Sequence, residues 1–419
     1  MSIWNTLRYL VPILAMLGSN FFFAMAGIFG FEYLGIENSN AFLVYAGLVF
    51  VANVEFYLRS INRNGGRVSI TDISVFLLFG AIIISYLVPS LSTGRLNPAS
   101  TMFLRNFLAF ALPSIVAAIS VSKMKALSKM VSLLEVVMII LSISIILKVI
   151  VPYFQGQRLL TFAGAVYHQT GSYLAALAFG LNLYFLLNGS YHERLAPFRT
   201  RFYRVICLLL LVVQVLGFVL PGGRGGFVLG VIYFLFIVVS QITRRRLKTV
   251  FRVLLLVAFL AAVIGVSWPL LMQNDLFVRG FNRATQFISG SGGINWAGTS
   301  GRDSVYQIAL HLIKESPIIG YGIFGMYEVI GYYPHNFFLE ILLQGGVIFL
   351  IVAVSILLLF MRKLRHMIRQ DKSNGILAVL FLYPIVMLMF SGTYLNTPQF
   401  WFVLVFVLAY RKPKTVLID

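Results

Sequence analysis

The sequence predicts an all-α fold, a polytopic membrane bundle of about 12 transmembrane helices that we treat as one domain over residues 1–419. Of these residues, 59% are apolar and only 11% are charged, whereas a soluble domain carries about 25% charged residues. Apolar runs long enough to cross a bilayer, about 20 residues, recur along the chain between short polar breaks. A water-soluble protein of this size has no interior large enough for so much apolar surface.

Twelve apolar runs, each bounded by polar clusters, are the expected transmembrane spans. An even number of spans places both chain ends on the same side of the membrane. The first run follows Arg8 and exceeds the roughly 7–15 apolar residues of a signal peptide, so we expect an uncleaved span. The runs cover residues 9–29, 40–58, 72–91, 102–120, 131–151, 170–188, 203–220, 226–241, 250–270, 336–361, 375–391 and 397–410.

Basic residues are dense in every second polar segment, which indicates the orientation. Lys and Arg mark the cytoplasmic loops of membrane proteins, and 24 of the 33 present lie in these segments. The pattern predicts cytoplasmic N- and C-termini, and it explains the net charge of +20 without a nucleic-acid partner. The dense segments are residue 8 and residues 59–67, 123–129, 194–204, 244–252, 362–372 and 411–414. The remaining nine residues face outward and are Arg95, Arg105, Lys148, Arg158, Arg224, Arg279, Arg283, Arg302 and Lys314.

Arg224 differs from the other outward arginines in its neighbours. It lies in the hairpin Pro221-Gly-Gly-Arg-Gly-Gly, which joins two spans and has almost no other polar side chain. The glycines allow a tight turn and a close approach of the backbone. Many outward charges are only solvated, but a lone guanidinium at the head of two membrane helices is also suited to bind an anion. We expect Arg224 to do so.

One outer loop, residues 271–335, is much longer than the others, and loops beyond roughly 15 residues are usually functional or disordered. Its aromatic residues and helical periodicity argue against disorder. A glycine-rich hinge at 289–293 precedes an amphipathic helix that begins near Ser300 and ends before Pro317. The helix is expected either to lie flat on the bilayer or, in addition, to bind phosphate through Arg302 at its N-terminus. Its apolar face is expected to comprise Val305, Ile308, Ala309, Leu312 and Ile313.

Another polar group lies where the tenth span begins. His335 and Asn336 follow Tyr332 and Tyr333, and Glu340 lies about one helical turn later. Asn336 is a suitable helix cap, and the histidine is either an interfacial residue or a base that takes a proton from a hydroxyl near neutral pH. An unpaired carboxylate is costly inside a membrane, so we expect Glu340 to orient His335 or to pair with an arginine.

No motif for a metal or a cofactor accompanies these residues. The sequence lacks HExxH, GxSxG and Walker A patterns, and its outer carboxylates are scattered, so we expect neither a metal site nor a cofactor. The single cysteine, Cys207, rules out a disulfide framework.

In these same segments the chain resembles the O-antigen ligase and O-antigen polymerase superfamily, bacterial membrane glycosyltransferases that use undecaprenyl-pyrophosphate-linked glycans. The hydropathy plan is similar over most of the chain, and the motif similarity covers mainly residues 221–350. Arg224 matches a family arginine more loosely than the other motifs do. The matching motifs are Ser300-Gly-Arg302 with its amphipathic helix, Pro317 with Gly320-Tyr-Gly322, His335-Asn336 with Leu339, and Gly345-Gly346.

The resemblance implies a GT-C-like fold and a metal-independent, inverting glycosyl transfer at the outer face of a bacterial inner membrane. It implies that Arg302 and Arg224 hold the donor pyrophosphate and stabilise its charge as it leaves. It also implies that His335 is the general base for the acceptor hydroxyl, and that grooves between spans hold the polyprenyl tail. Further donor and acceptor contacts are expected from Arg158, Arg279, Arg283, Tyr332, Tyr333, Asn336, Glu340 and His168.

The superfamily divides by acceptor. A polymerase joins one lipid-linked repeat unit to another, whereas a ligase moves the finished glycan to lipid A-core or to a protein. We expect a polymerase, because polymerases are abundant in the family, with a ligase as the alternative. The expected partners are both glycan lipids, membrane lipids, and a chain-length regulator or flippase.

A transporter or flippase is the competing class. Three observations argue against this class. The long loop follows the ninth span on the outside, not the sixth span on the inside as in the major facilitator plan. The two halves of the chain show no sequence repeat, and the spans lack the midplane charges that ion-coupled transport usually needs.

Overall fold

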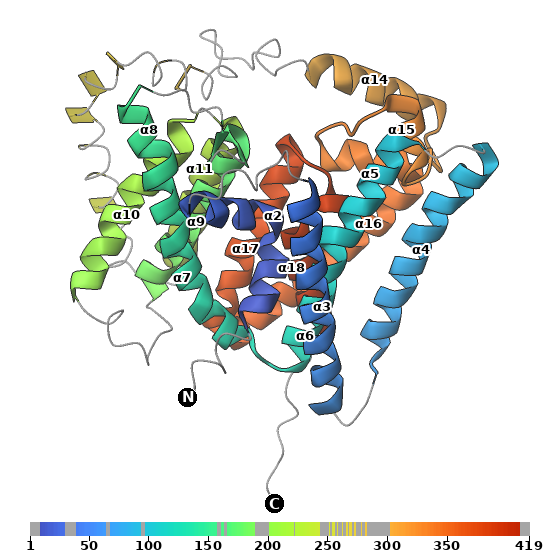
Figure 1. Ribbon diagram of the computed structural model, residues 1–419, viewed down its shortest axis with the longest axis horizontal. Helices are drawn as coiled ribbons and strands as arrows, with labels where there is room; N and C mark the ends of the chain where they lie inside the picture. Colours follow the sequence, from blue (N-terminus) through green and yellow to red (C-terminus); the bar gives the residue numbers. More distant parts are fainter. Residues whose placement is uncertain are drawn as a thin grey trace, which may run out of the picture.

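The computed structural model describes residues 9–29, 39–63, 68–93, 97–156, 161–162, 166–188, 201–221, 223–243 and 302–410, together with isolated positions between 251 and 282. Figure 1 shows a bundle of helices in which α14 and α15 lie together at one end.

Helices make up nearly all of the described chain, as the composition predicts. Within the described ranges the strands are β1 (Thr161–Phe162) and β2 (Val166–Tyr167), an antiparallel pair in which Thr161 faces Tyr167. The helices in the first half are α2 (Leu10–Ile28), α3 (Ser39–Arg63), α4 (Ile70–Thr93), α5 (Pro98–Asn106), η2 (Phe107–Ala111), α6 (Leu112–Lys123), α7 (Leu127–Ile145), η3 (Ile146–Ile150), α8 (Val151–Phe154) and α9 (His168–Asn188). Those in the second half are α10 (Arg201–Val219), α11 (Arg224–Thr243), α14 (Arg302–Glu315), α15 (Gly325–Ile330), α16 (Phe337–Gln370), η6 (Lys372–Asn374), α17 (Gly375–Phe390), η7 (Tyr394–Asn396) and α18 (Pro398–Ala409).

The membrane-spanning character of the chain follows from these helices. Seven of the described helices are long and apolar enough to cross a bilayer, and three shorter apolar helices accompany them. Every expected span coincides with a described helix except 250–270, which lies largely outside the described residues. The chain is therefore a multi-pass membrane protein, whereas the total of about 12 spans and the GT-C-like arrangement stay predictions.

Polar contacts between helix ends mark the two opposite ends of the bundle. At the first end, Ser100 at the start of α5 donates to the carbonyl of Phe324, 3.0 Å away. At the opposite end, Lys123 at the end of α6 pairs with Asp72 near the start of α4 at 2.6 Å. We call the first the site end (the starts of α9, α11 and α16 and the end of α17) and the second the basic end (the end of α16 and the α6–α7 turn).

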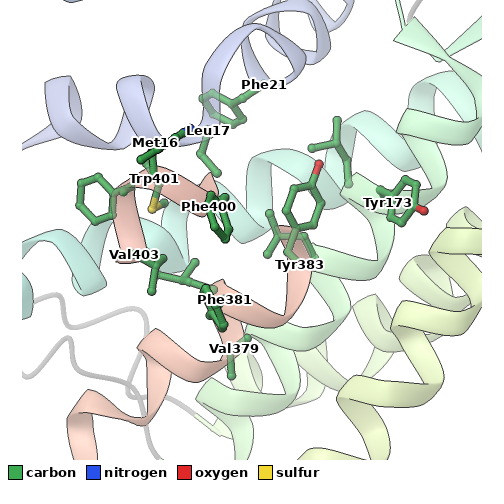
Figure 2. Close-up of a cluster of buried hydrophobic side chains, with 14 of the residues drawn as sticks. Met16, Leu17, Phe21, Tyr173, Val379, Phe381, Tyr383, Phe400, Trp401 and Val403 are labelled. Atoms are coloured by element: carbon green, nitrogen blue, oxygen red, sulfur yellow. The ribbon is translucent and has the colours of Figure 1, made fainter. Parts of the chain in front are cut away.

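The core centres on α9, which packs against α7, α10, α11 and α17. Two glycines in the middle of α9 and α11 allow close packing: a Cβ on Gly180 would lie 2.7 Å from the ring of Tyr233, and one on Gly230 would lie 2.7 Å from Phe218. Figure 2 shows aromatic and aliphatic side chains of α2, α17 and α18 packed around this region. Tyr173, near the start of α9, meets Tyr383 of α17 edge to face, with ring centroids 6.2 Å apart. The core therefore reaches the site end through Tyr173.

Candidate functional site

Helix α16 is broken near its start, and a loop fills the break. Gly345 and Gly346 have non-helical backbone angles, and Gly346 has φ +60°. The segment 317–322, which we call the strap, follows α14 and lies against this break. The glycines of Pro317-Ile-Ile-Gly-Tyr-Gly and Gly345-Gly346 thus belong to one structural unit.

Four backbone hydrogen bonds join the strap to α16. Irregular backbone at membrane depth is tolerated only where its polar groups are satisfied by other protein groups, and the strap supplies these partners. Since the strap directly continues α14, the bonds fix α14 relative to the start of α16. They run from Tyr321 N to Leu343 O (2.8 Å), Gly322 N to Gln344 O (2.7 Å), Val347 N to Pro317 O (2.8 Å) and Ile348 N to Ile318 O (3.3 Å).

Helix α14 begins at Arg302, as the sequence predicts. Of the expected apolar face, Ala309 is fully buried, and Leu312 and Ile313 pack against the core as half-buried side chains. Ile308 is 46% exposed and lies outside the part of this face that packs against the core. The helix docks on α16. The expected cap, Ser300, lies outside the described residues.

His335 lies in a strained turn immediately before α16. Its φ of +54° is in the left-handed region, which is uncommon for a residue other than glycine. The ring meets Tyr333 edge to face, with centroids 4.6 Å apart, and its Nδ1 is buried without a hydrogen-bond partner among the described residues. Burial, and secondly the charge of Arg302, lower the pKa of His335 from its ordinary value of 6.5. The imidazole is therefore neutral at pH 7, the form in which a ring nitrogen can accept a proton.

Arg224 is the first residue of α11, and the surrounding glycines bring this helix start onto α9. A Cβ on Gly225 would lie 1.8 Å from the hydroxyl of Tyr173. A Cβ on Gly226 would lie 2.5 Å from the backbone carbon of Ser172. The glycines thus allow the backbones of α9 and α11 to approach closely, as the sequence predicts. This packing places Arg224 beside Tyr173.

Arg302 connects this region to His335. The half-buried Arg302 lies near enough to interact electrostatically with Tyr173, Tyr333 and His335. Because Tyr173 also packs against Gly225, the starts of α11 and α14 and the turn before α16 meet at one end of the bundle. The structure therefore brings together the regions of Arg224, Arg302 and His335, which lie far apart in the sequence.

The structure corrects the expectation for Glu340. Its carboxyl is 1% exposed and accepts hydrogen bonds from the hydroxyl of Thr393 and, at 3.4 Å, from Nε2 of Gln344. It neither bonds to His335 nor pairs with an arginine of the described chain. A buried carboxyl needs hydrogen-bond partners, and here hydroxyl and amide donors supply them in place of a guanidinium.

Asn336 caps α16, with Oδ1 accepting from the backbone amides of Phe338 (3.0 Å) and Leu339 (3.2 Å). Tyr332 is 39% exposed at the site end. The backbone of His168 begins α9, also at the site end. Three predicted donor contacts lie outside the described residues, and these are Arg158, Arg279 and Arg283.

Sequence reasoning missed three residues that line this region, Tyr173, Ser391 and Thr393. Ser391 donates to the hydroxyl of Tyr173 at 3.3 Å, and Thr393 donates to Glu340. Tyr173 lies inside an apolar run, and Ser391-Gly-Thr393 is simply the polar break between the last two spans. The only signal was that this break is polar.

Within the described residues no group of three His, Cys, Asp or Glu side chains is placed to hold a metal ion.

A protein-family model matches part of the chain. Residues 207–354 match the family described as O-Antigen ligase, and this segment contains Arg224, Arg302, His335 and the strap. No curated protein and no solved structure matches the chain significantly. Over residues 207–354 the chain is therefore similar to the O-antigen ligase family.

Proposed function

We propose that the protein polymerises undecaprenyl-pyrophosphate-linked oligosaccharide repeat units, such as those of O-antigen, capsule or exopolysaccharide, at the outer face of the bacterial inner membrane. The observation that carries the proposal is the meeting of two basic helix starts with a neutral imidazole. Arg302 interacts with both Tyr173 and His335, and Tyr173 packs beside the start of α11 at Arg224. Guanidinium groups and helix N-termini both favour a phosphate-bearing ligand.

In the proposed reaction the acceptor hydroxyl attacks the anomeric carbon of the donor glycan. The bond from that carbon to the pyrophosphate oxygen breaks, and undecaprenyl pyrophosphate leaves with the electron pair. His335 takes the hydroxyl proton, which its lowered pKa permits at neutral pH. Arg302 and Arg224 stabilise the negative charge that grows on the leaving group. The single displacement inverts the anomeric centre and needs no metal ion.

The remaining residues have supporting roles in this proposal. The exposed ring of Tyr332 and the ring of Tyr333 contact the sugars, and His168 lies at the same end of the bundle. The site end faces the periplasm or exterior, and both termini lie in the cytoplasm. Clustering of basic side chains at the opposite end, among them Lys125, Lys129, Arg362, Arg365 and Arg369, supports this orientation.

Ligation is the second candidate, favoured by the description of the matching family. In that reaction the same site transfers the glycan to lipid A-core or to a protein. The donor chemistry is shared, so the two candidates differ only in the acceptor hydroxyl.

Reconstituted protein given lipid-linked repeat units tests the proposal. Longer glycans on lipid support polymerisation, glycan on added lipid A-core supports ligation, and translocation without a new bond would mean a flippase. We expect Arg302→Ala and His335→Ala each to abolish transfer with normal expression. Lys314→Ala and His311→Ala are matched controls on the exposed part of α14. Full transfer by either site variant would remove that residue from the mechanism.

A further inference from the structure

The tripeptide Ser391-Gly-Thr393, which we call the clasp, lies between α17 and η7 and has no role in the reaction described above. It is also outside the segment 207–354 that matches the family. Yet each of its three residues makes a hydrogen bond to a different element of the site end.

The three bonds run to α9, to the turn before α16, and to α16 itself. Ser391 Oγ donates to the hydroxyl of Tyr173, 3.3 Å away. The backbone amide of Gly392 donates to the hydroxyl of Tyr333. The hydroxyl of Thr393 donates to Oε1 of Glu340.

Each partner of the clasp is the neighbour of a proposed site residue. Tyr173 packs against Gly225, beside Arg224. Tyr333 packs against the ring of His335 at 4.6 Å. Glu340 donates its backbone amide to the carbonyl of Asn336 at 2.9 Å, in the first turn after His335. The clasp therefore touches the supports of both the anion-binding and the proton-accepting groups.

The clasp has little freedom to move. Thr393 is fully buried, as is its partner carboxyl, and a buried carboxyl that loses a donor is left unsatisfied. The network continues from Glu340 through Gln344 to the hydroxyl of Tyr394. Gly392 has φ +86°, a conformation that other residues adopt only with strain. The geometry on both sides of Thr393 is thus fixed by buried polar contacts.

We infer that the clasp positions the glycosyl-transfer site, with Thr393 and Glu340 as positioning residues that fix Gly392, whose backbone holds Tyr333 against His335. This inference rests on the proposed function, because His335 is the group whose position matters. The clasp acts through Tyr333, so its loss misplaces the imidazole without removing any group that touches the substrate.

The pair Thr393→Val and Thr393→Ser tests the inference in the full-length protein. Valine keeps the shape but removes the hydroxyl, whereas serine retains it. We expect Thr393→Val to lower kcat by roughly ten-fold or more with little change in KM for the donor, since an unsatisfied buried carboxyl costs at least one hydrogen bond. Thr393→Ser should restore most of this loss. Thr243→Val, at the basic end of α11, is the matched control and should transfer glycan normally.

A second readout does not depend on glycan transfer. The rate of modification of His335 by diethyl pyrocarbonate is followed by mass spectrometry, with the exposed His311 and His366 as internal references. We expect His335 alone to react at least several-fold faster in Thr393→Val and at the wild-type rate in Thr393→Ser.

The two readouts separate the possible failures. Unchanged His335 labelling and unchanged kcat in Thr393→Val would overturn the clasp, and so would equal acceleration at all three histidines, which would mean general loosening. A selective rise at His335 in a protein that transfers no glycan even as wild type would retain the clasp and refute the proposed function.

Discussion

Replacing Gly346 with alanine introduces one methyl group where the strap meets the break in α16. The added Cβ would lie 2.3 Å from both the carbonyl carbon and the oxygen of Ile318, and 2.6 Å from the oxygen of Pro317. These are backbone atoms, which cannot rotate away as a side chain would. Either the strap or the break must therefore move.

The magnitude follows from two contributions. Gly346 has φ +60° and ψ −156°, a region essentially restricted to glycine, where another residue costs about 1–3 kcal/mol. Displacing the strap also weakens the bonds that Val347 and Ile348 donate to it, each worth about 1 kcal/mol. We expect the free energy of unfolding to fall by roughly 2–5 kcal/mol. Since the strap links α14 to α16, transfer activity should fall as well.

The effect is measured by thermal unfolding in a single detergent, with intrinsic fluorescence as the signal. Gly80→Ala is the matched control, because α4 is also an apolar helix and no atom lies within 4 Å of the added Cβ. We expect Gly346→Ala to melt several degrees below wild type, with the control at or above it. Equal melting temperatures for the two variants would show that the strap does not hold the break, and the argument from backbone contact would fail.

Three further outcomes are expected. The acidic limb of the pH profile of kcat/KM should lie below pH 6.5, because burial and a nearby guanidinium lower the pKa of His335 and only its neutral form accepts a proton; a limb above pH 6.5 would contradict its role as base. Gly225→Ala should impair donor binding, measured as a raised KM, because its Cβ would lie 1.8 Å from the hydroxyl of Tyr173. Lys123→Met should lower the free energy of unfolding by about 3–5 kcal/mol in denaturation experiments, because it leaves the fully buried Asp72 without its cation. Breaking the exposed pair of Arg59 and Glu55 in α3 should cost under about 1 kcal/mol.

Much of the candidate site could be predicted because its residues carry local signals. Arg224 and Arg302 stand out as arginines where the pattern of basic loops does not place them, and both begin helices in the structure. Asn336 caps α16 as its residue type predicts. In each case the signal lies within a few residues of sequence, so no knowledge of the fold was needed.

The role of Glu340 was not predictable in this way. A carboxylate inside an apolar run needs partners, but its partners Thr393 and Gln344 are ordinary polar residues with no local signature. Thr393 lies 53 positions away in the sequence. Its contact exists only because α17 returns the chain to the site end.

By itself the sequence determined that the chain crosses a membrane several times, where most of its helices lie, and which arginines and histidine are candidates for chemistry. Hydropathy, glycine clusters and helix caps are local properties, so they can be read along the chain. The tertiary structure alone decided that the strap fills the break at Gly345 and Gly346, and that Tyr173 and the clasp support the site. These contacts join residues that are remote in sequence, and burial makes them strong only after the helices have packed.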